Sequence, residues 1–78
     1  MPVVQISVPA GALSTDQKQQ LISRITDAVV DVEGIPQLRS SVHVLITEVA
    51  DGGWGTGGKA WTLQTLRAAF SERTDAKS

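Results

Sequence analysis

The sequence predicts an α+β protomer, in which two parallel strands joined by a crossover helix are followed by a small C-terminal hairpin and helix. Three observations predict this fold: a strand-like alternation at residues 3–8, a helical apolar stripe after Ser14, and a β-branched run at residues 42–48. A strand, a helix and a second strand in this order form a βαβ unit with parallel strands and a right-handed crossover. Since the chain has 78 residues, we expect residues 1–78 to form a single domain.

Both predicted strands show the period of two that half-buries a pleated segment. In residues 3–8 the even-numbered positions hold valine or isoleucine, and in residues 42–48 Val42, Val44 and Ile46 do, so each set shares one face of its strand. The opposite face of the second strand carries His43 and Leu45. We therefore expect one face of the sheet to lie under the helix and the other to remain partly apolar.

The helix between these strands has clear signals at both ends. Ser14 and Gln17 have the spacing of a capping box, which satisfies backbone amides at a helix start. Gly34 is a natural C-terminal cap, and Pro36 prevents the helix from resuming. The apolar side chains between these ends fall on one helical stripe: Leu21, Ile22, Ile25, Ala28, Val29 and Val32.

The C-terminal third predicts a turn and a further helix. Five of the seven residues from 52 to 58 are glycine, around Trp54 and Thr56, which predicts a turn or a short hairpin. Leucines and a phenylalanine then recur at helical spacing over residues 63–70, which predicts a short helix. Residues 72–78 are polar, and we expect them to fray.

Composition excludes several function classes. The chain has no cysteine and one histidine, which disfavours a disulfide framework, a structural zinc site and a Ser-His-Asp triad. Its formal net charge is −1, with seven basic and eight acidic residues scattered along the chain, so we expect no nucleic-acid partner. No apolar run is long enough to span a membrane, and no signal peptide is recognisable, so we expect a cytoplasmic protein.

Two strands and one helix cannot close a hydrophobic core by themselves. Small domains without disulfides or metals commonly gain stability by association. Pairing of two copies would produce a four-stranded sheet under two helices, and further copies would cover the remaining apolar surface. The sequence therefore predicts a homo-oligomer.

Pro2 is the residue to which chemistry is most easily assigned. Removal of an initiating methionine before proline would leave a secondary amine at the start of the first strand. Apolar surroundings lower the pKa of an amine because burial disfavours its charged form, and a base with a pKa near the working pH suits proton abstraction next to a carbonyl. The alternative is that Pro2 only blunts an exposed strand edge. From position alone, this alternative is favoured.

A set of short motifs, in order from Pro2 to Gly58, resembles the 4-oxalocrotonate tautomerase family. They are Pro2, the strand at residues 3–8, Gly11, Asp16-Gln17-Lys18, Leu21-Ile22, Val44-Leu45-Ile46-Thr47-Glu48 and Trp54-Gly55-x-Gly57-Gly58. The resemblance implies a β-α-β protomer that forms dimers and then a hexamer, a trimer of dimers. It also implies an amino-terminal proline that moves protons between carbon and oxygen of enol and keto acids, without a cofactor or a metal.

Carried over residue by residue, the resemblance makes Pro2 the catalytic base. Trp54 stands where the family has an aromatic residue that keeps the pocket apolar. His43 stands where the family has an arginine, and it could donate a hydrogen bond to the substrate. Arg39, near the start of the second strand, is a candidate substitute cation, although a solvated loop arginine is its better supported interpretation.

The sequence also departs from the family pattern. The family's other arginine follows the glycine that matches Gly11, where this chain has Ala12 and Leu13. Neutral side chains cannot replace a bidentate arginine–carboxylate contact. We therefore expect a monocarboxylate or an aromatic enolpyruvate as the substrate, rather than an unsaturated dicarboxylate.

The first hypothesis for function is thus a cofactor-free tautomerase that acts on a small 2-keto acid or its enol. Relatives with the same fold add water to acrylate-like acids or remove halide or carbon dioxide from them. These chemistries rank second among the enzyme hypotheses, because no carboxylate in the sequence obviously fills the role of activating water. The second hypothesis, from a different class, is a non-catalytic oligomeric scaffold or small-ligand binder, which the loss of both arginines suggests. Retention of Met1 would favour it, because the nitrogen of Pro2 would then be an amide.

Overall fold

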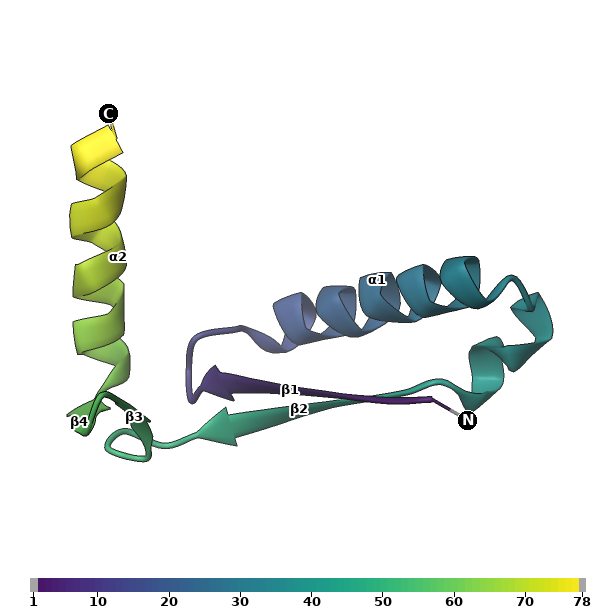
Figure 1. Ribbon diagram of the computed structural model, residues 1–78, viewed down its shortest axis with the longest axis horizontal. Helices are drawn as coiled ribbons and strands as arrows, with labels where there is room; N and C mark the ends of the chain where they lie inside the picture. The colour runs from purple at the N-terminus through teal and green to yellow at the C-terminus, as the bar shows by residue number, and fades with distance from the viewer. Residues whose placement is uncertain (1, 78) are drawn as a thin grey trace. The chain divides into compact units, whose positions relative to one another are not determined.

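The computed structural model describes residues 2–77, with side chains up to residue 70 (Figure 1). The chain divides into two compact units. One holds the chain up to Val8 together with Leu13–Thr47, and the other holds Pro9–Ala12 together with the chain from Glu48 onward. The assignment of residues 1–78 to a single domain stays a prediction.

The first unit is the predicted βαβ unit. Strands β1 (Val3–Pro9) and β2 (His43–Val49) are hydrogen-bonded neighbours and run in the same direction, and helix α1 (Thr15–Glu33) connects them (Figure 1). Each strand ends one residue later than predicted. The α+β fold class and the crossover helix are therefore confirmed.

Both ends of α1 form as the sequence predicts. The backbone N–H of Gln17 donates to Oγ of Ser14 at 3.1 Å, and the N–H of Ser14 donates to Oε1 of Gln17 at 2.8 Å. At the other end Gly34 has φ = 72°, a left-handed conformation in which glycine has no Cβ penalty. Its N–H donates to the carbonyl of Val30 at 2.8 Å, which completes the C-terminal cap.

A short 3₁₀ helix, η1 (Pro36–Ser41), lies between α1 and β2, where the sequence predicts no helix or strand. Pro36 stands in its first turn, where the fixed φ of proline fits a helix start and its missing N–H costs nothing. Pro36 thus ends α1 and also begins the next helical segment. The side chain of Arg39 forms an ion pair with Asp27, which joins η1 to α1.

The two faces of the sheet differ in burial as the alternation predicts. The even-numbered side chains from Val4 to Val8 and from Val44 to Ile46 are half-buried, and the odd-numbered ones at positions 3–7 and 43–47 are exposed. Leu45 and Val3 on the open face are 48% and 54% exposed. Among the described side chains no apolar residue is fully buried, and only Thr26 falls in the buried class.

A protomer without a buried apolar side chain in residues 2–70 must complete its core with other chains. The open sheet face, which carries Leu45, is the apolar surface available for this purpose. This agrees with the association between copies of the chain that the sequence predicts.

The glycine-rich stretch of the second unit is a hairpin. Strands β3 (Trp54–Thr56) and β4 (Lys59–Trp61) pair antiparallel, with Trp54 opposite Trp61. The two turn residues, Gly57 and Gly58, have φ of 57° and 83°. Positive φ at both central positions is the requirement of a type I′ turn, which glycine meets without strain.

Helix α2 (Leu63–Lys77) is longer than predicted. The N–H of Leu63 donates to Oδ1 of Asp51 at 2.8 Å, and the N–H of Thr65 donates to Oγ1 of Thr62 at 3.2 Å, so side chains cap its first turn. The segment predicted to fray is helical to Lys77, because it is rich in Glu, Arg, Ala and Lys, which favour helix. Ser78 lies outside the described residues.

Within residues 2–77, neither helix is both long and apolar enough to cross a bilayer. The cytoplasmic location stays a prediction.

Candidate functional site

Pro2 is held at the start of β1. It is half-buried, and its carbonyl accepts a hydrogen bond from the N–H of His43 at 3.0 Å. This bond fixes Pro2 beside the first residue of β2. Met1 lies outside the described residues, so its removal stays a prediction.

Pro2 lines an open pocket of about 450 Å³ with four residues of the last two turns of α1. Ala28, Val29 and Val32 form an apolar wall, and Glu33 supplies a carboxylate. Val32 is 86% exposed, so this wall remains open to solvent or to a further molecule. The pocket thus combines an apolar surface with one ionisable side chain beside the proline.

His43 lies next to Pro2 through the backbone, but its side chain belongs to the other face of the sheet. It is an exposed odd-numbered residue of β2, whereas Pro2 continues the half-buried alternation of Val4 and lines the pocket on the α1 side. The imidazole of His43 is not among the side chains that line the Pro2 pocket. Within one protomer, the two predicted site residues are therefore adjacent without facing one another.

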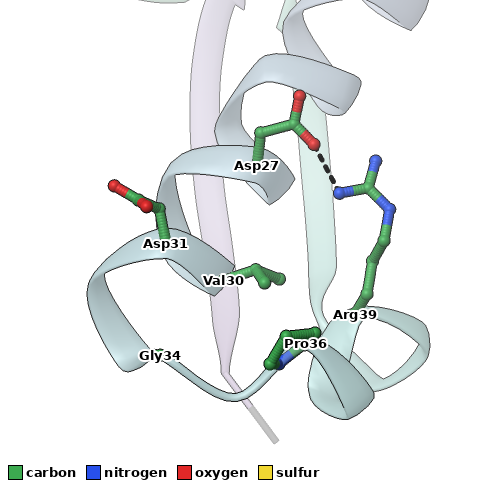
Figure 2. Close-up of a pocket in the computed structure, with 6 residues that line it drawn as sticks. All are labelled: Asp27, Val30, Asp31, Gly34, Pro36 and Arg39. Carbon is green, nitrogen blue, oxygen red and sulfur yellow. Dashed lines mark hydrogen bonds and ion pairs between the residues drawn. The ribbon is translucent and has the colours of Figure 1, made fainter.

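Arg39 lines a different pocket, of about 330 Å³, between the end of α1 and η1 (Figure 2). Its guanidinium is paired with Asp27, and both side chains are largely exposed. Figure 2 shows Asp27 directed toward Arg39 and Asp31 directed away from it. Pro2 is not among the residues that line this pocket, so within one protomer Arg39 is already neutralised at a separate position.

Trp54 belongs to the second unit, where it is half-buried and pairs across the hairpin with Trp61. Nε1 of Trp61 donates to Oγ1 of Thr56 at 2.7 Å. Nζ of Lys59 lies 4.6 Å from the centre of the Trp61 ring, a cation–π distance. The hairpin therefore holds its two tryptophans in a defined arrangement.

Glu33 is the residue in the Pro2 pocket that sequence reasoning missed. A signal for it was present, because Glu33 follows Val29 by four positions and lies on the same side of the helix. The apolar stripe thus ends in a carboxylate one residue before the cap at Gly34.

Among the described residues, no group of three or more His, Cys, Asp or Glu side chains could hold a metal ion.

These features define a class: a βαβ protomer that carries a proline at the head of its first strand and associates with copies of itself. The family model described as "Tautomerase enzyme" matches residues 2–64, and the chain belongs to this family. The protein is therefore an enzyme of the tautomerase type.

Curated relatives agree with this assignment. The chain is 33% identical over 69 residues to the probable tautomerase K2 of Dickeya dadantii (strain 3937), an alignment that covers 88% of this chain and 100% of the relative. It is 39% identical over 59 residues to a 2-hydroxymuconate tautomerase of Pseudomonas putida, which covers 76% of this chain and 89% of the relative.

Among solved structures, the chain is similar to the apo form of an unfused 4-OT. The TM-score is 0.66 at 39% sequence identity, over 76% of this chain and 97% of that chain. Together with the family match, this similarity confirms the 4-oxalocrotonate tautomerase family predicted from the motifs.

Proposed function

We propose that the protein interconverts the enol and keto forms of a small 2-keto acid, with the amine of Pro2 as general base and then general acid. In ketonisation, the Pro2 nitrogen takes the proton of the enol hydroxyl, and the resulting ammonium gives a proton to the neighbouring carbon. The proton count balances, and the amine is regenerated. The name of the 2-hydroxymuconate tautomerase relative, an enzyme for an enol acid, supports this substrate class.

The observation that carries the proposal is the environment of Pro2. Its carbonyl is fixed by the N–H of His43 at 3.0 Å, and Ala28, Val29 and Val32 form an apolar wall of the open pocket that Pro2 lines. An apolar wall disfavours the charged form of an amine and so favours a base near neutral pH. A fixed strand position reduces the cost of orienting that base toward a substrate.

The other predicted residues take supporting roles in this proposal. Trp54 would be an apolar wall, and His43 a donor that orients the substrate. Arg39 would bind the substrate carboxylate. To do so, it must first break its ion pair with Asp27. The proposed assembly is a hexamer, a trimer of dimers, in which the residues of several protomers complete each site.

Ketonisation of an aromatic enolpyruvate tests the proposal, with protein whose mass shows that Pro2 is the first residue. We expect Pro2→Ala to lower kcat/KM by about 100-fold or more, the usual contribution of general acid–base catalysis. Pro9→Ala is the matched control, since Pro9 ends the same strand and is also half-buried. Activity of Pro2→Ala equal to that of Pro9→Ala would contradict the mechanism.

A second candidate is a hydratase, dehalogenase or decarboxylase that acts on acrylate-like acids. The observation that favours it is the carboxylate of Glu33 in the Pro2 pocket, because such a group could activate water. Incubation with 3-haloacrylates and release of halide would distinguish this activity from tautomerisation.

A further inference from the structure

Glu33 occupies an unfavourable position for a carboxylate. It is the last residue of α1, where unpaired backbone carbonyls give the helix its negative end. Cations are favoured at this end, but the last turn of α1 contains no basic residue. The local sequence therefore gives Glu33 no electrostatic reason to be where it is.

Glu33 has no hydrogen-bond or ion-pair partner among the described residues, and neither has Asp31 on the same helix, whereas Asp16 and Asp27 each have one. Asp27 is paired with Arg39, and Oδ2 of Asp16 accepts a hydrogen bond from Nε2 of Gln20 at 3.1 Å. Both unpaired carboxylates are exposed, and of the two only Glu33 lines the pocket that also holds Pro2.

The pocket shows which charge could compensate Glu33. Its lining residues are Pro2, three apolar residues of α1 and Glu33 itself. Once Pro2 is the first residue, its protonated amine is a cation, and no lysine or arginine lines this pocket. Among the residues that line this pocket, the protonated amine of Pro2 is thus the one cation that could pair with Glu33.

We propose that the carboxylate of Glu33 forms an ion pair with the protonated amine of Pro2 and acts as the positioning residue of the site. Two titratable residues adjoin Pro2: Glu33 from α1 lines the same pocket, and His43 from β2 donates its backbone N–H to the Pro2 carbonyl. The proposal rests on the proposed function only in requiring a free amine at Pro2.

The ion pair has a consequence for the substrate. A negative group beside the amine repels a second substrate carboxylate at short range. It therefore favours acids with a single carboxylate. This agrees with the absence of arginine at Ala12 and Leu13.

Titration of the Pro2 nitrogen tests the ion pair directly. The chain has three prolines, and after removal of Met1 only Pro2 has an ionisable nitrogen, so ¹⁵N-proline labelling and NMR follow it alone. Because an opposite charge favours the charged form of an amine, we expect Glu33→Gln to lower the pKa of Pro2 by about one unit.

Asp31→Asn is the matched control. Asp31 is two residues away on the same helix and loses the same charge, but it lines the Arg39 pocket and not the Pro2 pocket. The ion pair is supported if the pKa of the Pro2 amine falls in Glu33→Gln and is unchanged in Asp31→Asn. A pKa unchanged in Glu33→Gln, or lowered equally in both variants, overturns it.

This measurement separates the ion pair from the proposed catalysis, because it needs no substrate. If Pro2→Ala kept full activity while the titration showed the expected shift, the proposed function would fail and the ion pair would stand. If Pro2→Ala lost activity and the titration showed no shift, only the ion pair would fail.

Discussion

The βαβ unit and the hairpin–helix unit are stabilised by different kinds of interaction. The βαβ unit half-buries Leu21, Ile22, Ile25 and Val29 of the α1 stripe together with the even-numbered side chains of the sheet. It leaves Leu45 on the open face. The second unit depends on local hydrogen bonds, such as those from Leu63 N–H to Asp51 and from Nη2 of Arg67 to the carbonyl of Gly11 at 3.3 Å.

The difference shows where each unit obtains its stability. Burial of apolar area contributes about 25 cal/mol per Å² to the free energy of folding. In the βαβ unit much of the apolar area stays exposed until another chain covers it. Individual hydrogen bonds contribute only about 0.5–1.5 kcal/mol each, so the second unit depends on several of them together. The first unit should therefore respond to changes in assembly, and the second to changes in backbone geometry.

The largest effect is expected from a charge on the open face of the sheet. Leu45→Asp places a carboxylate where the protomer exposes apolar surface, and its burial in an assembly would cost several kcal/mol. We expect the oligomer to dissociate and the subunit to unfold at a lower temperature, measured by light scattering and circular dichroism. Gln19→Asp, an equal charge change at an exposed position of α1, should leave the assembly intact.

An intermediate effect is expected in the hairpin turn. Gly58 has φ = 83°, and a Cβ there costs about 1–2 kcal/mol although nothing lies within 4 Å of it. Gly58→Ala should therefore destabilise β3 and β4, measured by tryptophan fluorescence during denaturation. Gly58→Asn is the control, since asparagine tolerates a left-handed conformation better, and an equal loss in both variants would mean that backbone strain is not the cause.

The smallest effect on stability is expected from Arg39→Gln. Its ion pair with Asp27 is largely exposed, and such pairs contribute about 0–1 kcal/mol. The melting temperature should change little, whereas KM should rise if Arg39 binds the substrate carboxylate. Asp27→Asn releases Arg39 from its partner and should not raise KM. An unchanged KM in Arg39→Gln would assign Arg39 to structure alone.

Most of the fold could be predicted because its signals are local. The alternation of β1 and β2, the capping box of Ser14 and the paired glycines of the turn each follow from a few neighbouring residues. Helix η1 was missed because proline was interpreted only as the end of a helix, although it is equally suited to begin one.

The candidate site could be predicted only in part, because it depends on contacts between elements. The motifs identify Pro2, but only the packing of α1 beside it brings Glu33 into the same pocket. The pairing of Arg39 with Asp27 likewise joins residues 12 positions apart, and no local pattern indicates it. Nothing in the alternation of β2 indicates that His43 would meet Pro2 through its backbone.

The lack of a fully buried apolar side chain among the described residues has a consequence for how the enzyme behaves in dilute solution. When folding and association are coupled, the free energy of unfolding per subunit depends on the concentration of the chain. Specific activity should then rise with protein concentration until assembly is complete. At low expression the total activity would be less than proportional to the number of chains in the cell. The level of expression would therefore also regulate the specific activity of this tautomerase.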